Sequence, residues 1–297
     1  MKIKEVIEEG RKILSQNNID DETIITRELL TFMLNKPKQY LVIHLDYDID
    51  DKIYFEYKNN LQKIINGKPL QYITNKQEFM GLNFFVNENV LIPQPDTEIV
   101  VEQTLKKCNE LMKENDLLSK ENSQLLQTNS KIKILDLCTG SGAIAISLSS
   151  VLKEKADIFA SDISTKALDV AKFNNEKNGT NVKFIESDLF ENISANKFNI
   201  IVSNPPYIKK KVINTLSVQV QNEPHLALDG GDDGLDFYRK IIEQAYTYIE
   251  NGYLILEIGY DQKEDVEKLL KSNGKYAEIE TVKDLSGNDR CVIARVI

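Results

Sequence analysis

The chain has 297 residues, of which 41% are apolar, and its formal net charge is −9 at pH 7. This length suits one sizeable α/β domain with a smaller companion domain. The acidic charge argues against a protein that holds a nucleic-acid duplex mainly through phosphate contacts, because that mode needs a basic face. The run Lys209-Lys210-Lys211 is a local basic patch, but such runs are usually solvated surface.

Cysteine usage and hydropathy predict a cytoplasmic protein. Cys108, Cys138 and Cys291 are scattered and have no C-x-x-C spacing, which predicts free thiols and no disulfide or zinc framework. The first residues mix acids and bases with single apolar side chains, unlike a signal peptide. No apolar run approaches membrane-spanning length, so we expect no membrane partner. The cysteine spacing leads us to expect no metal centre.

Helical periodicity dominates the first part of the chain. Apolar residues recur at helical spacing between Val6 and Leu14, and Asp20 is placed to cap a second helix. Two more helical patterns follow, and Gly67 is a typical residue for the end of the last one. The sequence therefore predicts a helical bundle domain over residues 1–77.

The sequence pattern changes after this domain. Short apolar runs broken by glycine and asparagine predict a β-hairpin linker over residues 78–95. Pro93 and Pro95 stiffen the entry to a helix that we expect to start near Asp96. The polar stretch 106–131 allows either a continued helix or a mobile linker, and we assign it no function.

From Lys131 onward the sequence alternates strand and helix patterns, which is typical of a parallel sheet. The last two predicted strands are separated by a turn at 286–288 that leaves no room for a helix, so we expect them to pair antiparallel. This layout predicts an α/β, seven-stranded Rossmann-like domain over residues 96–297, as in class I S-adenosylmethionine-dependent methyltransferases, although fold alone does not fix function. The predicted strands cover residues 132–137, 157–161, 182–186, 198–203, 253–258, 277–282 and 291–296.

A glycine-rich loop, Cys138-Thr139-Gly140-Ser141-Gly142, follows the first of these strands. Gly140 and Gly142 let the backbone turn sharply and approach a ligand closely at the carboxyl end of the strand. With Ala145 the loop also fits the dinucleotide pattern G-x-G-x-x-A, and Asp162 lies near the distance expected of a ribose-binding acid. The loop by itself leaves a nicotinamide oxidoreductase and a methyltransferase open.

Three acidic residues at three successive strand ends favour S-adenosylmethionine. Asp136 suits the ammonium group of a methionine but would meet a pyrophosphate with like charge. Asp162 is placed to bind ribose hydroxyls, and Asp188 to accept a hydrogen bond from the adenine amine while Leu189 packs against the ring. Each acid alone could cap a loop or helix, and their shared placement is what indicates a cofactor site.

The segment Asn204-Pro205-Pro206-Tyr207 follows the fourth strand and predicts the reactive groups. Proline fixes its own φ and pushes the preceding residue toward extended geometry, so this turn is stiff. The side-chain oxygen of Asn204 and the carbonyl of Pro205 can each accept one N–H of a planar NH2 group, and Tyr207 can stack on it or wall the pocket. Catalysis would come from positioning in a dry pocket, with no strong base.

These segments resemble the peptide chain release factor N5-glutamine methyltransferases, the PrmC or HemK family, over nearly the whole chain. The residues of this family's cofactor site map onto Cys138 to Gly142, Asp162, Asp188 and Leu189, and its glutamine site maps onto Asn204 to Tyr207. The resemblance implies S-adenosylmethionine as cofactor and the glutamine of the Gly-Gly-Gln loop of class 1 release factors as substrate, with the helical domain helping to dock that protein. Other segments that carry the resemblance are Pro69 to Ile73, Leu91 to Glu98 and Glu223 to Leu235, and the departures are Gln94 for the usual arginine and Cys138 for the usual glycine.

Several alternatives remain open at this point. The same motif could methylate a ribosomal-protein glutamine, or adenine N6 in nucleic acid. Methylation of adenine N6 would need a domain that reads the target sequence and a cationic channel for a flipped base, and neither is visible in the sequence. We therefore expect no sequence-specific nucleic-acid binding. A nicotinamide oxidoreductase would leave Asn204 to Tyr207 unexplained, and the two histidines, His44 and His225, offer it no obvious proton relay. A nucleotide-binding scaffold would bind the cofactor and transfer no methyl group.

Overall fold

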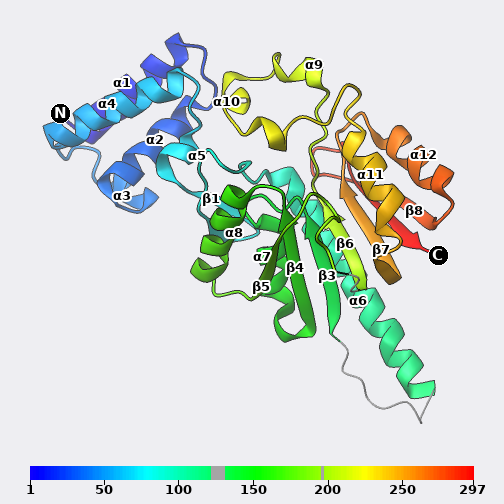
Figure 1. Cartoon of the computed structure of the whole chain (residues 1–297). Coiled ribbons are helices and arrows are strands. Elements are labelled where there is room, and N and C mark those ends of the chain that lie inside the picture. The colour runs from blue at the N-terminus through cyan, green and yellow to red at the C-terminus, as the bar shows by residue number, and fades with distance from the viewer. Residues whose placement is uncertain (122–130, 195–196) are drawn as a thin grey trace. The chain divides into compact units, whose positions relative to one another are not determined.

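The computed structural model describes residues 1–121, 131–194 and 197–297, and it divides the chain into two compact units (Figure 1). One unit comprises Met1–Lys76 together with Leu216–Asn222. The other comprises Gln77–Thr215 together with Glu223–Ile297. A short segment from the later part of the sequence thus belongs to the helical unit.

The first unit is helical, as its periodicity predicts. Its core contains the fully buried side chains of Leu14, Leu29 and Tyr57. The predicted cap at Asp20 is wrong, because α2 begins after Asp21, which adopts a left-handed φ of 58° and makes no side-chain cap hydrogen bond. The helices are α1 (Ile3–Gln16), α2 (Glu22–Leu34), α3 (Lys38–Ile43), α4 (Asp51–Ile65), α5 (Leu70–Thr74) and α10 (Val218–Gln221).

The predicted hairpin is present and short. Strands β1 (Gln77–Phe79) and β2 (Leu82–Phe84) pair antiparallel around Met80 and Gly81, both with positive φ. A 3-10 turn η1 (Pro95–Thr97) then leads into α6 (Glu98–Glu121). The stretch predicted as helix or linker is thus helical as far as residue 121, and residues 122–130 lie outside the described part of the chain.

The second unit is built on a seven-stranded sheet in the order β5-β4-β3-β6-β7-β9-β8. Strands β3 to β7 run parallel, and β9 pairs antiparallel with both β7 and β8. This confirms the α/β class and the antiparallel pair at one edge. The strands are β3 (Ile132–Leu137), β4 (Ala156–Asp162), β5 (Val182–Glu186), β6 (Phe198–Ser203), β7 (Ile249–Glu257), β8 (Tyr276–Lys283) and β9 (Asp289–Val296).

Helices cover the strands of this sheet. Leu135 and Leu137 pack in one cluster with Tyr238 and Ile241 of α11. Because side chains alternate along a strand, the intervening Asp136 faces the opposite side of the sheet, toward α7. The elements that accompany the sheet are α7 (Ala143–Leu152), η2 (Lys153–Lys155), α8 (Thr165–Lys177), α9 (Lys210–Ile213), η3 (His225–Ala227), α11 (Asp236–Ala245) and α12 (Lys263–Asn273).

The strand order reverses beside β3. Its neighbours are β4, the next strand in the chain, on one side and β6 on the other (Figure 1). The connections that leave β3 and β6 therefore diverge, which opens a crevice at the carboxyl ends of the strands. This crevice holds the residues that the sequence singles out.

Candidate active site

A cavity lies at the carboxyl ends of β3, β4, β5 and β6. The predicted residues that line it are Cys138, Gly140, Asp162, Asp188, Leu189, Asn204 and Pro206. The remaining predicted residues surround the cavity without being among the described residues that line it: Asp136, Thr139, Ser141, Gly142, Pro205 and Tyr207. The fold thus brings cofactor and substrate candidates from four strands to one cavity.

The glycine loop takes an unusual backbone path. Cys138, Gly140 and Gly142 have φ values of 59°, 56° and 83°. A β-carbon on Gly142 would lie 2.7 Å from Cδ1 of Ile146 and would have to displace that side chain, and the positive φ at this position also favours glycine. A β-carbon on Gly140 would meet no atom within 4 Å, which leaves the loop open where it lines the cavity.

Asp136 joins the glycine loop to α7 through hydrogen bonds to both. Its Oδ2 accepts hydrogen bonds from Oγ1 of Thr139 at 2.6 Å and from the backbone N–H of Ala145 at 3.2 Å. Its Oδ1 is buried and has no hydrogen-bond partner among the described residues. Burial raises the pKa of Asp136 to about 7, against the lowering effect of those two hydrogen bonds.

Asp162 ties the end of β4 to the same loop. Its Oδ2 accepts a hydrogen bond from the backbone N–H of Gly140 at 2.9 Å, and its Oδ1 accepts one from Ser164 at 2.9 Å. Burial raises the pKa of Asp162, while the hydrogen bonds from backbone N–H groups lower it. Two of the three predicted acids thus organise the glycine loop, and Asp162 also faces the cavity.

The turn after β5 supplies the third acid. The backbone N–H of Ser187 donates to the carbonyl of Asp162 at 3.0 Å, which joins this turn to the end of β4. The Ser187 hydroxyl donates to the carbonyl of Leu189 at 2.9 Å, and Leu189 adopts a positive φ of 46°. Asp188 and Leu189 are presented to the cavity from this fixed turn.

The reactive segment leaves β6 beside the glycine loop. Oγ of Ser203 donates to the carbonyl of Leu137 at 2.7 Å, which fixes the start of the segment against β3. Nδ2 of Asn204 donates to Oγ1 of Thr97 at 3.2 Å. Nε2 of Gln262 donates to the carbonyl of Tyr207 at 3.0 Å. Hydrogen bonds with three separate parts of the chain therefore hold this segment in addition to its two prolines.

The segment Glu223 to Leu235, singled out by the family resemblance, supports the reactive segment. The backbone N–H of Ile208 donates to the carbonyl of Leu228, and that of Gly230 donates to the carbonyl of Ile208, both at 2.9 Å. A β-carbon on Gly230 would lie 2.7 Å from Cα of Tyr207. Glycine at 230 therefore allows the two backbones to approach closely.

Glu257 is a buried acid behind the reactive segment that the sequence analysis missed. Its Oε1 accepts a hydrogen bond from the Tyr207 hydroxyl at 3.3 Å. Burial raises the pKa of Glu257 to about 7, while hydrogen bonding from Thr97, the charge of Arg290 and the Tyr207 hydroxyl lower it. Its placement at the end of β7 is the same signal that identified the other three acids, and that signal could have found it.

Arg290 fixes the surroundings of Glu257. Its guanidinium lies 3.2 Å from Oδ2 of Asp96 and 3.1 Å from Oδ2 of Asp284, and it donates to the carbonyl of Ile258 at 3.3 Å. Arg290 is only 8% exposed, so these pairs are partly shielded from water. Asp96 lies next to Thr97 in η1, so Arg290 links the turn before α6 to β9.

Glu223 joins two segments that line the cavity. Its Oε2 accepts a hydrogen bond from the backbone N–H of Ile92 at 2.8 Å. Leu91 on one side and Pro224 on the other both line the cavity. Burial raises the pKa of Glu223 to about 7. Gln94 donates from Nε2 to the carbonyl of the same Ile92 at 2.9 Å.

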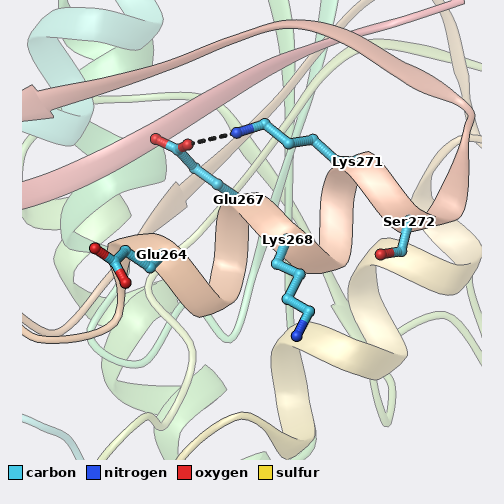
Figure 2. A pocket seen from close by; sticks show the side chains of 5 residues that line it. All are labelled: Glu264, Glu267, Lys268, Lys271 and Ser272. Carbon is cyan, nitrogen blue, oxygen red and sulfur yellow. Dashed lines mark hydrogen bonds and ion pairs between the residues drawn. The ribbon is translucent and has the colours of Figure 1, made fainter.

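A second hollow lies along α12 and is lined by Glu264, Glu267, Lys268, Lys271 and Ser272 (Figure 2). All five side chains come from this one helix, and Nζ of Lys271 lies 2.8 Å from Oε2 of Glu267. Neighbouring pairs of this kind are common on solvated helix surfaces. This hollow therefore contributes nothing to the candidate active site.

Cysteines and potential metal ligands form no further site in the described residues. The three cysteines are free, as predicted. Within residues 1–121, 131–194 and 197–297, no group of three or more His, Cys, Asp or Glu side chains is arranged to hold a metal ion. None of the helices in that part of the chain is long and apolar enough to span a membrane.

Solved structures similar to this chain are methyltransferases. The catalytic domain of hMettl16, in complex with MAT2A 3′UTR hairpin 6, aligns with a TM-score of 0.56 at 14% identity and covers 78% of this chain and 82% of that one. A methyltransferase from Pyrococcus furiosus aligns with a TM-score of 0.50 at 16% identity and covers 80% and 98%. At these identities the likeness shows the fold alone.

Sequence comparisons are more specific. The family described as PrmC N-terminal domain matches residues 5–74, and the one described as Methyltransferase small domain matches residues 113–231. The release factor glutamine methyltransferase of Bacillus subtilis is 36% identical over 90% of this chain and 89% of its own length. That of Clostridium acetobutylicum is 38% identical over 99% of this chain and 98% of its own length. The match extends over both units, and the chain belongs to the release factor glutamine methyltransferase family.

Proposed function

We propose that this protein transfers a methyl group from S-adenosylmethionine to the side-chain amide nitrogen of the glutamine in the Gly-Gly-Gln loop of class 1 peptide chain release factors. The observation that carries the proposal is that Asn204 and Pro206 line the same cavity as Gly140, Asp162 and Leu189. A methyl donor and an amide acceptor must meet within one pocket, and this cavity offers residues suited to both.

The residues around the cavity fit S-adenosylmethionine. The glycine loop is open at Gly140, where a β-carbon would meet no atom within 4 Å. The unpartnered Oδ1 of Asp136 is a buried acceptor beneath that loop and suits an ammonium group. Asp162 would hold the ribose hydroxyls, and Asp188 with Leu189 would hold the adenine. When bound, the cofactor supplies a methyl group on a positively charged sulfur.

Residues of the reactive segment can overcome the main chemical difficulty of the reaction, the low nucleophilicity of an amide nitrogen. An amide nitrogen is a poor nucleophile because its lone pair is delocalised into the carbonyl, a conjugation reflected in the barrier of about 18–20 kcal/mol to rotation about such bonds. Oδ1 of Asn204 and the carbonyl of Pro205 would each accept one N–H of the substrate amide, which fixes the direction of its lone pair. The proton shed after methylation is acidic enough to leave to water, so no strong base is needed.

Tyr207 has a supporting place in this proposal. Its hydroxyl donates to Glu257, and burial raises its pKa, so it remains protonated at neutral pH. A neutral, fixed phenol ring can bound the site of a planar amide without adding charge. The helical unit, whose residues 5–74 match the PrmC N-terminal domain, would help to dock the release factor, and we expect the reaction to occur in the cytoplasm.

Transfer of a labelled methyl group tests the proposal. The purified protein would be incubated with labelled S-adenosylmethionine and, separately, a class 1 release factor, ribosomal proteins and adenine-containing nucleic acid. We expect label on the release factor and none on the other two. Label on a ribosomal protein or on nucleic acid, with an unlabelled release factor, would overturn the substrate assignment and leave the cofactor in place.

A further inference from the structure

Thr97 contacts the reactive segment from a distant part of the sequence. It ends η1, is 4% exposed, and lies 107 residues before Asn204. Its Oγ1 lies 3.2 Å from Nδ2 of Asn204. An asparagine amide has a donor end and an acceptor end, and a partner at one end decides which way the group points. With Nδ2 held by Thr97, Oδ1 is the end left for another ligand.

The burial of Thr97 makes it a stable partner for this amide. A threonine hydroxyl can accept a hydrogen bond from a side-chain N–H. Because Thr97 is 4% exposed, water is largely excluded from taking its place as the acceptor. The bond from Nδ2 of Asn204 to Oγ1 of Thr97 therefore leaves Oδ1 as the end that can accept from a substrate N–H.

We propose that Thr97 is a positioning residue for methyl transfer, which holds the Asn204 amide by accepting a hydrogen bond from its Nδ2. This inference rests on the proposed function and adds a residue to it. At the other end of the reactive segment, the Tyr207 hydroxyl donates to the buried Glu257, so each end of the segment has a buried partner. Arg290 lies 3.2 Å from Oδ2 of Asp96, the neighbour of Thr97, and this ion pair ties Thr97's turn to β9.

The matched pair Thr97→Val and Thr97→Ser tests the role of the hydroxyl. Valine keeps the branched shape and removes the hydroxyl, whereas serine keeps the hydroxyl. With the full chain and a purified class 1 release factor, we expect Thr97→Val to lower kcat by roughly 10- to 100-fold, the scale of a misplaced reacting group. The affinity for S-adenosylmethionine should change by less than about two-fold, and Thr97→Ser should restore most of kcat.

A double-mutant cycle separates positioning from a merely structural role. If Thr97 acts through Asn204, then adding Thr97→Val to Asn204→Ala should cost little beyond the single Asn204→Ala change. An equal loss of kcat in both backgrounds would contradict the proposal.

A measurement that does not depend on turnover keeps this inference distinct from the substrate assignment. The side-chain NH2 signal of Asn204 can be identified in a 15N-labelled protein by its loss in Asn204→Ala. We expect slow exchange of these protons with water in the wild type and in Thr97→Ser, and faster exchange in Thr97→Val. Identical exchange in all three would overturn the positioning role, whereas a clear difference in a protein that leaves the release factor unlabelled would overturn only the substrate.

Discussion

The carboxylate of Asp162 accepts a hydrogen bond from the backbone N–H of Gly140 at 2.9 Å, and this contact joins the ends of β3 and β4 at the cavity. Asp136 joins the same loop to α7 by accepting hydrogen bonds from Thr139 and Ala145. The glycine loop is therefore fixed by side chains as well as by its own backbone. Gly140 and Gly142 have different roles within this loop.

Alanine at Gly142 should destabilise the fold more than alanine at Gly140. Both residues have positive φ, where a β-carbon costs about 1–2 kcal/mol. At Gly142 the new carbon would also lie 2.7 Å from Ile146 and 3.2 Å from Ala171, and such overpacking adds about 1 kcal/mol or more. Urea unfolding of the two variants measures the difference. Equal stabilities would show that the packing of Gly142 on α7 carries no cost.

Cys138 provides a test of backbone strain. It has a φ of 59°, in the left-handed region that favours glycine. Cys138→Gly and Cys138→Ala both remove the thiol, but only glycine relieves the left-handed strain. We expect Cys138→Gly to be the more stable of the two by about 1 kcal/mol, because glycine's extra freedom in the unfolded state offsets part of the gain. A more stable alanine variant in thermal unfolding would contradict this reading of the loop.

Asn204→Ala separates cofactor binding from turnover. The change removes the acceptor proposed for the substrate amide and leaves Asp162, Asp188 and Leu189 unchanged. We expect the affinity for S-adenosylmethionine, measured by calorimetry, to stay within a few-fold, and kcat to fall by at least about 100-fold. Strong loss of cofactor affinity with normal turnover at saturating cofactor would assign Asn204 to the cofactor instead.

Stability should fall as pH rises through the window set by Glu257. The ordinary pKa of a glutamate is 4.5, and burial raises that of Glu257 to about 7. Between these values the folded protein holds a proton that the unfolded chain has lost, so the free energy of unfolding decreases with rising pH. The stabilisation from this proton is complete below about 4.5 and is lost above about 7.

Glu257→Gln removes this one titration. Asp136 and Glu223 titrate in the same sense, with pKa values of about 7, so the wild type should lose stability through all three. In urea unfolding between pH 4.5 and 7, the variant should gain stability relative to the wild type as the pH rises. A constant difference over this range would show that Glu257 titrates alike in both states.

The parts of the fold that the sequence predicts are those with local signals. The strand Ile132–Leu137 is a buried parallel strand, so it reads as an apolar run that ends at the glycines of the next loop. The strand Phe198–Ser203 likewise ends at a pair of prolines. The sequence also places Cys138 to Gly142 and Asn204 to Tyr207 at the same sheet edge, since the carboxyl ends of parallel strands meet there.

The parts that the sequence does not predict depend on contacts between distant residues. Thr97 reaches Asn204 over 107 residues, and Glu223 reaches Ile92 over 131. The residues around a buried threonine or glutamate form no local sequence pattern that indicates a partner so distant in the chain. The sequence also does not show that Oδ2 of Asp136 accepts a hydrogen bond from Thr139 of the glycine loop, because this contact depends on the folded path of the loop.

Peptide mapping of the methylated release factor tests the central claim most directly. The release factor would be treated with the protein and S-adenosylmethionine, digested, and analysed by mass spectrometry beside a variant whose loop reads Gly-Gly-Ala. We expect one added methyl group on the side chain of the loop glutamine and none in the Gly-Gly-Ala variant. A methyl group on another residue, or transfer that persists in that variant, would contradict it.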